Sequence, residues 1–299
     1  MKYMLSIFLF IFSAPSYCLT ECSVHFYPTI FYFEKTEDPS PGYFFKKTDC
    51  LTDVQQKIIK AIYSYDSNLK AKYIEKILSE EIPNYKIKIY PDQFKFIEFK
   101  NYLQNHLILS KDQIIIKTNL LNNSSFLKLD DEQKIKFTCE DCHFLGHKNI
   151  KISIYNSNTN ISTNEWVNAE IATKTKVLIS TKNINPSNRG FLENDFREDY
   201  IYATKPEIYF SALNEIQFYR PTQSLAEGNV LKNNDIIPFD IVKYGHPTTI
   251  IFEKDGISLS GTAIPVKNAK YNEIVKLQRQ NKTYVSGRVI NFNQVKVDL

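Results

Sequence analysis

The clearest pattern in the sequence is the run Gly228-Asn229-Val230-Leu231-Lys232-Asn233-Asn234-Asp235-Ile236, which is echoed by the earlier run Gly190-Phe191-Leu192-Glu193-Asn194-Asp195-Phe196. In each run a glycine permits a turn with positive φ, an apolar pair can re-enter the core, and an aspartate can cap a short turn. The two glycines lie out of register, and Asn188, a residue type that tolerates the left-handed conformation, stands at the position that corresponds to Gly228. The echo indicates short strands joined by tight turns.

From Trp166 onward the chain alternates strand-like runs with turn residues. Residues 166–172 and 176–180 suggest one hairpin, and Asp255-Gly256 between two strand-like runs is a strong signal for a second. Further strands are expected at 274–277, 284–290 and 294–297. The second half is therefore predicted to be all-β.

The first half mixes helical and strand periodicity. Helices are expected over 51–67 and 69–82, and the second stops at Pro83. Strict alternation over Tyr85–Tyr90 predicts a half-buried strand, and further strands are expected at 94–99, 113–117, 134–138 and 149–155. The segment 156–164, rich in Asn, Ser and Thr, is the best linker candidate. We therefore predict an α+β N-terminal domain at 19–160 and a β region at 161–299.

The N-terminal 18 residues have the pattern of a secretory signal. A short basic start precedes the apolar run Met4–Phe12, and the small residues Ser13, Ala14 and Ser16 follow, so that cleavage is expected after Ser16 or Cys18. The apolar run is too short to span a bilayer as a helix, and no later stretch reaches about 18 apolar residues. We expect a mature protein beyond the inner membrane, with no stable membrane insertion.

Composition and charge narrow the possible partners. The chain has 299 residues, is 43% hydrophobic and carries a formal net charge of +4, which is too small to indicate a nucleic-acid partner. Residues 253–299 hold eight basic and four acidic residues, so their balance equals that of the whole chain. A solvated strand face is one interpretation of this basic region. The other is a partner-binding surface formed by Lys267, Lys270, Lys276, Arg279, Lys282 and Arg288.

Four cysteines remain after removal of the signal: Cys22, Cys50, Cys139 and Cys142. In an exported protein they are read first as disulfides, and four cysteines allow three pairings. Of these we favour Cys22–Cys50, which closes an aromatic-rich segment, and Cys139–Cys142, which closes a tight loop.

The second cysteine pair has other interpretations. Cys139-Glu140-Asp141-Cys142-His143 spells the haem-attachment pattern, but the only methionines are Met1 and Met4, so no mature methionine could be the sixth ligand. Cys139, Cys142, His143 and His147 could also hold zinc, although their spacing is shorter than in structural zinc fingers. A redox-active dithiol is the weakest option, because no helix start follows that would lower the pKa of the first thiol.

Motifs of catalysis are missing from the sequence. It has no G-x-S-x-G, H-E-x-x-H or P-loop motif. A glycosidase with two distant carboxylates stays open from sequence alone. We expect no enzyme and no cofactor.

The run from Ala226 to Val297 resembles the flagellar P-ring assembly protein family, periplasmic chaperones that end in a SAF domain of the β-clip type. The resemblance rests on Gly228–Ile236, on the hairpin Asp255-Gly256 followed by Gly261-Thr262-Ala263, and on Gly287-Arg288-Val289 with Gln294–Val297. It identifies Gly228, Gly256, Gly261 and Gly287 as turn-forming residues. Asn268 and Asn272 stand where the family often has glycine.

The resemblance implies a periplasmic chaperone that assists assembly of the P ring around the flagellar rod. Such a protein would hold the P-ring subunit without catalysis, through exposed β-edges and a basic surface. A pilus or envelope assembly factor with a SAF domain is the alternative, and a c-type haem or redox protein is a third possibility.

Overall fold

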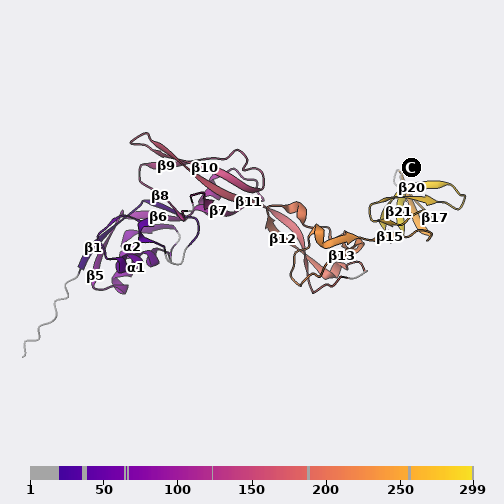
Figure 1. Ribbon diagram of the computed structural model, residues 1–299, viewed down its shortest axis with the longest axis horizontal. Helices are drawn as coiled ribbons and strands as arrows, with labels where there is room; N and C mark the ends of the chain where they lie inside the picture. The colour runs from indigo at the N-terminus through magenta and orange to yellow at the C-terminus, as the bar shows by residue number, and fades with distance from the viewer. Residues whose placement is uncertain are drawn as a thin grey trace, which may run out of the picture. The chain divides into compact units, whose positions relative to one another are not determined.

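The computed structural model (Figure 1) describes residues 20–35, 39–63, 65, 67–122, 124–186, 189–254 and 257–297. The predicted signal, Asn188 and the Asp255-Gly256 turn lie outside these residues. The chain divides into two compact units, Met1–Ala172 and Thr173–Leu299. The division falls later in the chain than the predicted boundary after residue 160.

The described residues of the first unit form three α-helices, ten strands and part of an eleventh. The helices are α1 (Thr52–Tyr63), α2 (Ala71–Glu81) and α3 (Phe99–His106). The strands are β1 (Thr20–Phe26), β2 (Thr29–Tyr32), β3 (Phe45–Thr48), β4 (Ser67–Lys70), β5 (Tyr85–Tyr90), β6 (Gln93–Glu98), β7 (Gln113–Leu120), β8 (Phe126–Leu129), β9 (Gln133–Thr138), β10 (Gly146–Asn156) and β11 (Ser162–Ser180).

These strands form three sheets. Two have the orders β3-β1-β5 and β4-β6-β2-β8, and in the third, β12-β11-β10-β9, the later strand β12 (Phe196–Ala203) pairs with the C-terminal part of β11, while β7 also pairs with β11. Alternation along β2 explains how the middle sheet serves two cores. Ile30 and Tyr32 are buried in one core with α1 and α2, whereas Phe31 is buried in a second core with α3 and the β10–β11 hairpin. The predicted α+β character of the N-terminal half is confirmed.

The apolar spacing of the helices explains which face each one buries. Val54, Ile58 and Ile62 recur every four residues along α1 and are fully buried. No helix in the described part of the chain is long and apolar enough to cross a membrane.

The predicted hairpin over 166–180 is wrong, because β11 is one continuous strand from Ser162 to Ser180. The intervening Thr173-Lys174-Thr175 contains no glycine, proline, asparagine or aspartate to break the strand, and threonine favours extended backbone.

The segment 156–164 is not a linker but the turn of the β10–β11 hairpin. The two strands pair in antiparallel register from Gly146 opposite Ile171 to Tyr155 opposite Ser162. Asn156 Oδ1 accepts hydrogen bonds from the backbone amides of Asn158 and Thr159, and Asn160 adopts φ 56°. Asparagine is common both in linkers and in such turns, which is why composition alone misassigned the segment.

The described part of the second unit contains strands and 3₁₀ turns and no α-helix. Its strands after β11 are β12 (Phe196–Ala203), β13 (Tyr219–Pro221), β14 (Ile236–Pro238), β15 (Asp240–Val242), β16 (Thr248–Lys254), β17 (Ile257–Pro265), β18 (Ala269–Lys270), β19 (Ile274–Gln278), β20 (Tyr284–Asn291) and β21 (Gln294–Val297). The 3₁₀ turns of this unit are η2 (Glu193–Asp195), η3 (Pro206–Ile208), η4 (Leu213–Phe218) and η5 (Asn233–Asp235). The first unit has one more, η1 (Pro41–Tyr43). A β-rich C-terminal region is therefore confirmed.

The last five strands, β16, β17, β19, β20 and β21, form a closed barrel, coloured orange to yellow in Figure 1. Its interior is filled by small and branched side chains, among them Val275, Leu277, Val289 and Val295, which are fully buried. More and less buried residues alternate along β19, β20 and β21, as a small barrel requires, whereas residues 258–262 of β17 are all exposed.

Two of the glycines expected in turns lie inside strands. Gly261 is part of β17 and Gly287 part of β20. A Cβ on Gly287 would lie 2.4 Å from the backbone oxygen of Lys296, so this glycine serves close packing between β20 and β21. Gly228 does lie in a turn, at φ 81°. Gly190 has no positive φ, and a Cβ there would lie 2.5 Å from Gln217 O.

Candidate functional site

The echoed sequence runs form two equivalent turns in the second unit. The carboxylate of Asp195 accepts a hydrogen bond from the amide of Leu192 at 3.0 Å, and that of Asp235 accepts one from Lys232 at 2.9 Å. In return, the backbone amide of Asp195 donates to the carbonyl of Leu192, and the backbone amide of Asp235 donates to the carbonyl of Lys232, both at 3.0 Å. Both aspartates are buried, at 6% and 7% exposure. The repeated glycine–aspartate pattern thus corresponds to a repeated structure.

This region has two halves, one with β11 and the Asp195 turn and the other with β13 and the Asp235 turn, and each turn bonds to a strand of the other half. The amide of Phe191 donates to the carbonyl of Tyr219, and the amide of Leu231 donates to the carbonyl of Leu178, at 3.0 and 2.8 Å. Each half therefore closes its turn against the strand that belongs to the other half. The core beneath is shared in the same way: Leu178, Phe191 and Phe196 from the first half pack with Ile216, Leu225 and Leu231 from the second.

The barrel begins next to this core. The ring of Phe218 stacks on Tyr271, with centroids 4.2 Å apart, and the Tyr271 hydroxyl donates to Glu215 at 3.4 Å. Burial raises the pKa of Tyr271, and the neighbouring Glu215 carboxylate adds to this rise. The hydroxyl stays protonated and available as a donor up to higher pH.

Two of the six predicted basic residues share one outer face of the barrel. Lys276 on β19 and Arg288 on β20 both point outward, and Ile274 lies directly opposite Arg288. The ammonium of Lys276 lies 4.3 Å from the ring centre of Tyr284. Ile274 and Tyr284 are 61% and 52% exposed. We call the group Ile274, Lys276, Tyr284 and Arg288 the β19–β20 face.

The other four predicted basic residues lie on β18 and in the connections around β18 and β19. Lys267 is exposed just before β18, Lys270 is half-buried on β18, and Lys282 lies in the β19–β20 turn at φ 65°. The guanidinium of Arg279 packs over Phe252, 4.9 Å from the ring centre. The structure therefore brings together only two of the six basic residues, and it places beside them Ile274 and Tyr284, which the sequence analysis did not single out, although the exposed phase of their strands carried that signal.

The barrel is closed, and each of its five strands pairs with two of the others. The register between β17 and β19 covers only Ile264 opposite Gln278 and Pro265 opposite Leu277, at the end of β17. Binding of a partner through an exposed β-edge of this region therefore stays a prediction.

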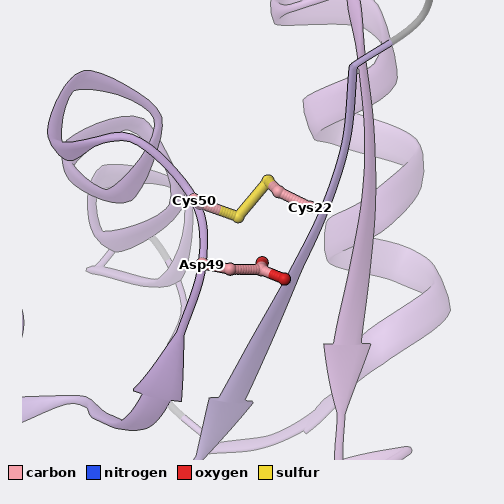
Figure 2. A group of neighbouring side chains, drawn as sticks. All are labelled: Cys22, Asp49 and Cys50. Carbon is pink, nitrogen blue, oxygen red and sulfur yellow. A yellow bond between two sulfur atoms is a disulfide. The ribbon is translucent and has the colours of Figure 1, made fainter.

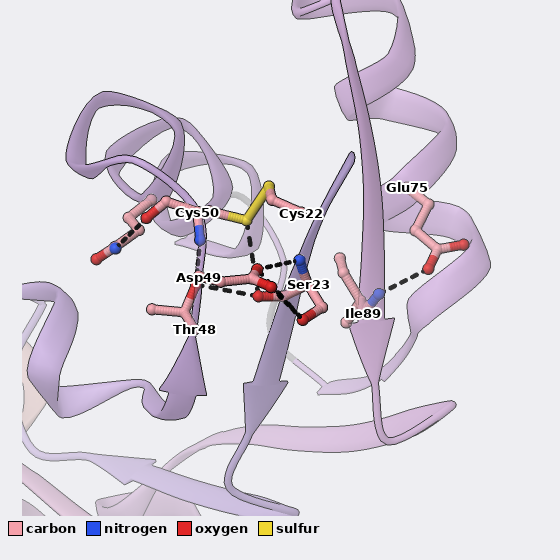
Figure 3. Close-up of a disulfide and its surroundings, with 8 residues drawn as sticks. Cys22, Ser23, Thr48, Asp49, Cys50, Glu75 and Ile89 are labelled. Atoms are coloured by element: carbon pink, nitrogen blue, oxygen red, sulfur yellow. Dashed lines mark hydrogen bonds between the residues drawn. A yellow bond between two sulfur atoms is a disulfide. The ribbon is translucent and has the colours of Figure 1, made fainter. Parts of the chain in front are cut away.

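In the first unit, Cys22 on β1 and Cys50 before α1 form a disulfide, as favoured from the sequence (Figure 2). Figure 3 shows the Asp49 carboxylate beside it, which accepts hydrogen bonds from the Ser23 amide at 2.5 Å and the Ser23 hydroxyl at 3.2 Å. The Ser23 amide lowers the pKa of the Asp49 carboxyl. The two sulfurs and the carboxylate lie within 4.8 Å of one another.

These three groups do not form a metal centre in this oxidised state, because thiolates and not disulfides bind metal ions. Both cysteines are buried, and the bond joins β1 to the segment that leads into α1. The role of this group is to hold the N-terminal strand to the body of the unit.

Cys139 and Cys142 form the second disulfide, which is also the favoured pairing. With both sulfurs bonded to each other, neither is a thiol that could attach haem or a thiolate that could bind zinc. The ring of His143 lies against Phe144 with centroids 3.9 Å apart, and His147 Nδ1 pairs with Asn168 Oδ1 at 3.2 Å. The loop therefore has neither of the two ligand sets considered from the sequence.

Comparison with solved structures gives low overall scores. The chain is similar to Salmonella FlgA in the closed form, with 14% identity, 67% of this chain and 97% of that chain covered, and a TM-score of 0.32. With the open form of Salmonella FlgA the identity is 14%, 67% of this chain and 91% of that chain are covered, and the TM-score is 0.35. With flagellar protein FlgA from Thermotoga maritima the identity is also 14%, 92% of this chain and 98% of that chain are covered, and the TM-score is 0.35. No curated protein matches the sequence.

Comparison with family sequence profiles is specific. Residues 175–297 match the family described as "Chaperone for flagella basal body P-ring formation". The matched range holds both equivalent turns, their shared core and the closed barrel. The resemblance inferred from Ala226–Val297 is confirmed, because residues 175–297 of this chain match the family of chaperones for flagella basal body P-ring formation.

Proposed function

We propose that this chaperone acts in the periplasm and holds the P-ring subunit, without catalysis, on the β19–β20 face of its barrel. The single observation that carries the proposal is the family match, because it covers the whole barrel. The periplasmic site rests on the signal pattern at residues 1–18.

The chemistry of the β19–β20 face supports a protein partner. Two exposed apolar side chains, Ile274 and Tyr284, alternate with two cations, Lys276 and Arg288. Within the described residues neither cation forms an ion pair: Arg288 bonds the oxygens of Asn272 at 3.0 Å, and Lys276 lies over Tyr284. Apolar anchors beside uncompensated positive charge suit a partner segment that is both apolar and acidic.

The test is co-purification of the mature protein with the P-ring subunit. We expect the double variant Lys276→Glu/Arg288→Glu to lose most of the captured subunit, because both attractions become repulsions. The matched control is Lys205→Glu, an exposed lysine of the same unit outside the barrel. If the double variant and the control capture equal amounts of the subunit, the β19–β20 face is not the binding surface.

A deletion strain separates the flagellar role from the pilus alternative. The flagellar role predicts lost motility and basal bodies that lack the P ring, whereas intact rings with missing pili would support the alternative. The absence of catalysis is tested in the same deletion strain. If the chaperone acts by binding alone, every variant that captures the P-ring subunit normally should restore ring assembly, including variants with substituted polar side chains.

A further inference from the structure

The β9–β10–β11 sheet of the first unit has one apolar and one polar face. Ile150 and Ile152 on β10 and Val167 and Ala169 on β11 are fully buried on the core side. The opposite side carries the alternate residues, and these are mainly amides, hydroxyls and lysines. Such a face is ordinary for an antiparallel sheet, with one exception.

The exception is Trp166, the only tryptophan in the chain. It lies on the polar face of β11, opposite Lys151, which in turn pairs with Thr138 on β9. Tryptophan is highly buried on average, whereas this side chain is 46% exposed. Among the described residues neither Trp166 nor Lys151 makes a side-chain hydrogen bond or ion pair.

A hollow of about 570 Å³ lies beside the Trp166 ring. Its floor is the sheet, with Thr138, Asn149 and Lys151, and one wall is the loop closed by the Cys139–Cys142 disulfide, which brings in Glu140 and Asp141. The disulfide therefore has a second effect besides local stability, because it fixes a wall of this hollow.

The polar groups of the hollow are held in place by their neighbours. Asn168 donates from Nδ2 to Asn149 Oδ1 at 3.1 Å, and Asn168 Oδ1 pairs with His147 Nδ1 at 3.2 Å. His147 Nε2 lies 4.0 Å from Glu170. The amide nitrogen of Asn149 keeps both donors free among the described residues. A ligand would meet a row of oriented donors and acceptors next to one flat ring.

This composition indicates the class of ligand. Lys148 and Lys151 balance Glu140 and Asp141, so the hollow favours neither an anion nor a cation. A protein contact would be expected to have an apolar centre, and here Trp166 is the single large apolar side chain. A sugar ring offers polarised C–H groups to the negative face of an indole and hydroxyls to amides.

We propose that this hollow binds a neutral glycan chain, with one sugar ring stacked on Trp166 and its polar groups bonded to Asn149 and Lys151. The site lies outside residues 175–297 and is independent of the β19–β20 face. A chaperone with such a site could be retained at a polysaccharide while it holds its partner.

The test uses the full mature protein, whose tryptophan emission reports on Trp166 alone. The probes are a β-1,4-linked tetramer of N-acetylglucosamine and, as a second source of neutral sugar, maltotetraose, each up to about 10 mM. We expect a saturable emission change with at least one probe, and the probe that binds identifies the source. No saturable change with either overturns the proposal.

Variants test the geometry by calorimetry. Trp166→Ala and Asn149→Ala should each weaken binding by about tenfold, the loss of one stacked ring or one oriented bond pair. The control is Tyr200→Ala, which removes an exposed ring on β12 and should leave affinity unchanged. Circular dichroism confirms folding of each variant. If Trp166→Ala abolishes capture of the P-ring subunit but leaves glycan affinity intact, the hollow is a protein contact and the proposal fails.

Discussion

Asp195 and Asp235 are structural equivalents: each buried carboxylate accepts the amide three residues before it, and the strand that follows begins at the next residue. The equivalence extends to Thr181 and Thr222, whose amides donate to the carbonyls of these aspartates, both at 2.9 Å. One local design is therefore used twice to turn the chain into β12 and into β14.

We predict that Asp235→Ala lowers the free energy of unfolding by about 1–3 kcal/mol, because it removes the buried carboxylate that accepts the Lys232 amide. The same change also removes the bond from Gln223 Nε2 to Asp235, at 2.6 Å. Urea unfolding measures the loss. Asp235→Asn is the control, since its amide oxygen can still accept, and it should retain most of the stability. Equal losses in the two variants would contradict a capping role.

Gly287→Ala should destabilise the barrel by roughly 2–3 kcal/mol or more, because the new methyl group would meet Lys296 O at 2.4 Å and Val295 Cγ1 at 2.6 Å. Gly261→Ala, on strand β17 of the same barrel, is the matched control. Its methyl group would meet Ile250 Cγ1 at 3.6 Å, an ordinary contact, so we expect a change within about 0.5 kcal/mol. The measurement is the melting temperature of both variants. A similar melting temperature for the two would contradict a close approach between Gly287 and the backbone of Lys296.

Removal of the Cys22–Cys50 disulfide by a double serine substitution should cost about 3.5 kcal/mol, because the bond closes a long loop, with a sequence separation of 28. The Cys139–Cys142 bond spans a separation of 3, so its removal should cost only about 2 kcal/mol. Urea unfolding with and without reductant compares the two. A larger loss for the shorter loop would show that chain entropy is not the controlling quantity.

Asp49 should contribute to acid sensitivity. Its carboxyl pKa is lower in the folded protein than the ordinary value of 3.8, chiefly through the Ser23 amide. Its contribution to stability is therefore present above that ordinary value and is lost as pH falls through the folded pKa. Asp49→Asn, which does not titrate, should make stability depend less on pH between roughly 5 and 2. An unchanged acid slope in urea midpoints would contradict this assignment.

Local patterns identified the elements that obey them. The alternation in Tyr85–Tyr90 predicts β5 with the observed bounds, and the glycine–aspartate runs predict both capped turns. These signals depend on neighbours along the chain, so one sequence is enough to find them. The disulfides are different, because four cysteines allow three pairings and the sequence only favoured the two that the structure shows.

Features that depend on distant contacts could not be found in this way. Gly287 looks like a turn residue until the backbone of Lys296 is brought beside it. The sequence does not tell which face of the sheet Trp166 occupies, and this follows only from the pairing of β11 with β10 and of β10 with β9. The continuity of β11 depends on its pairing with β10 along one part and β12 along the next. In each case the deciding neighbour is remote in sequence.

The exchange of turns between the two halves of the second unit also sets an order of events during synthesis. Leu178, Phe191 and Phe196 complete their core only with Ile216, Leu225 and Leu231. A nascent chain that ends near residue 205 therefore holds three apolar side chains with no partners from the second half. The shared core of this region is therefore complete only when the chain has been made as far as residue 231.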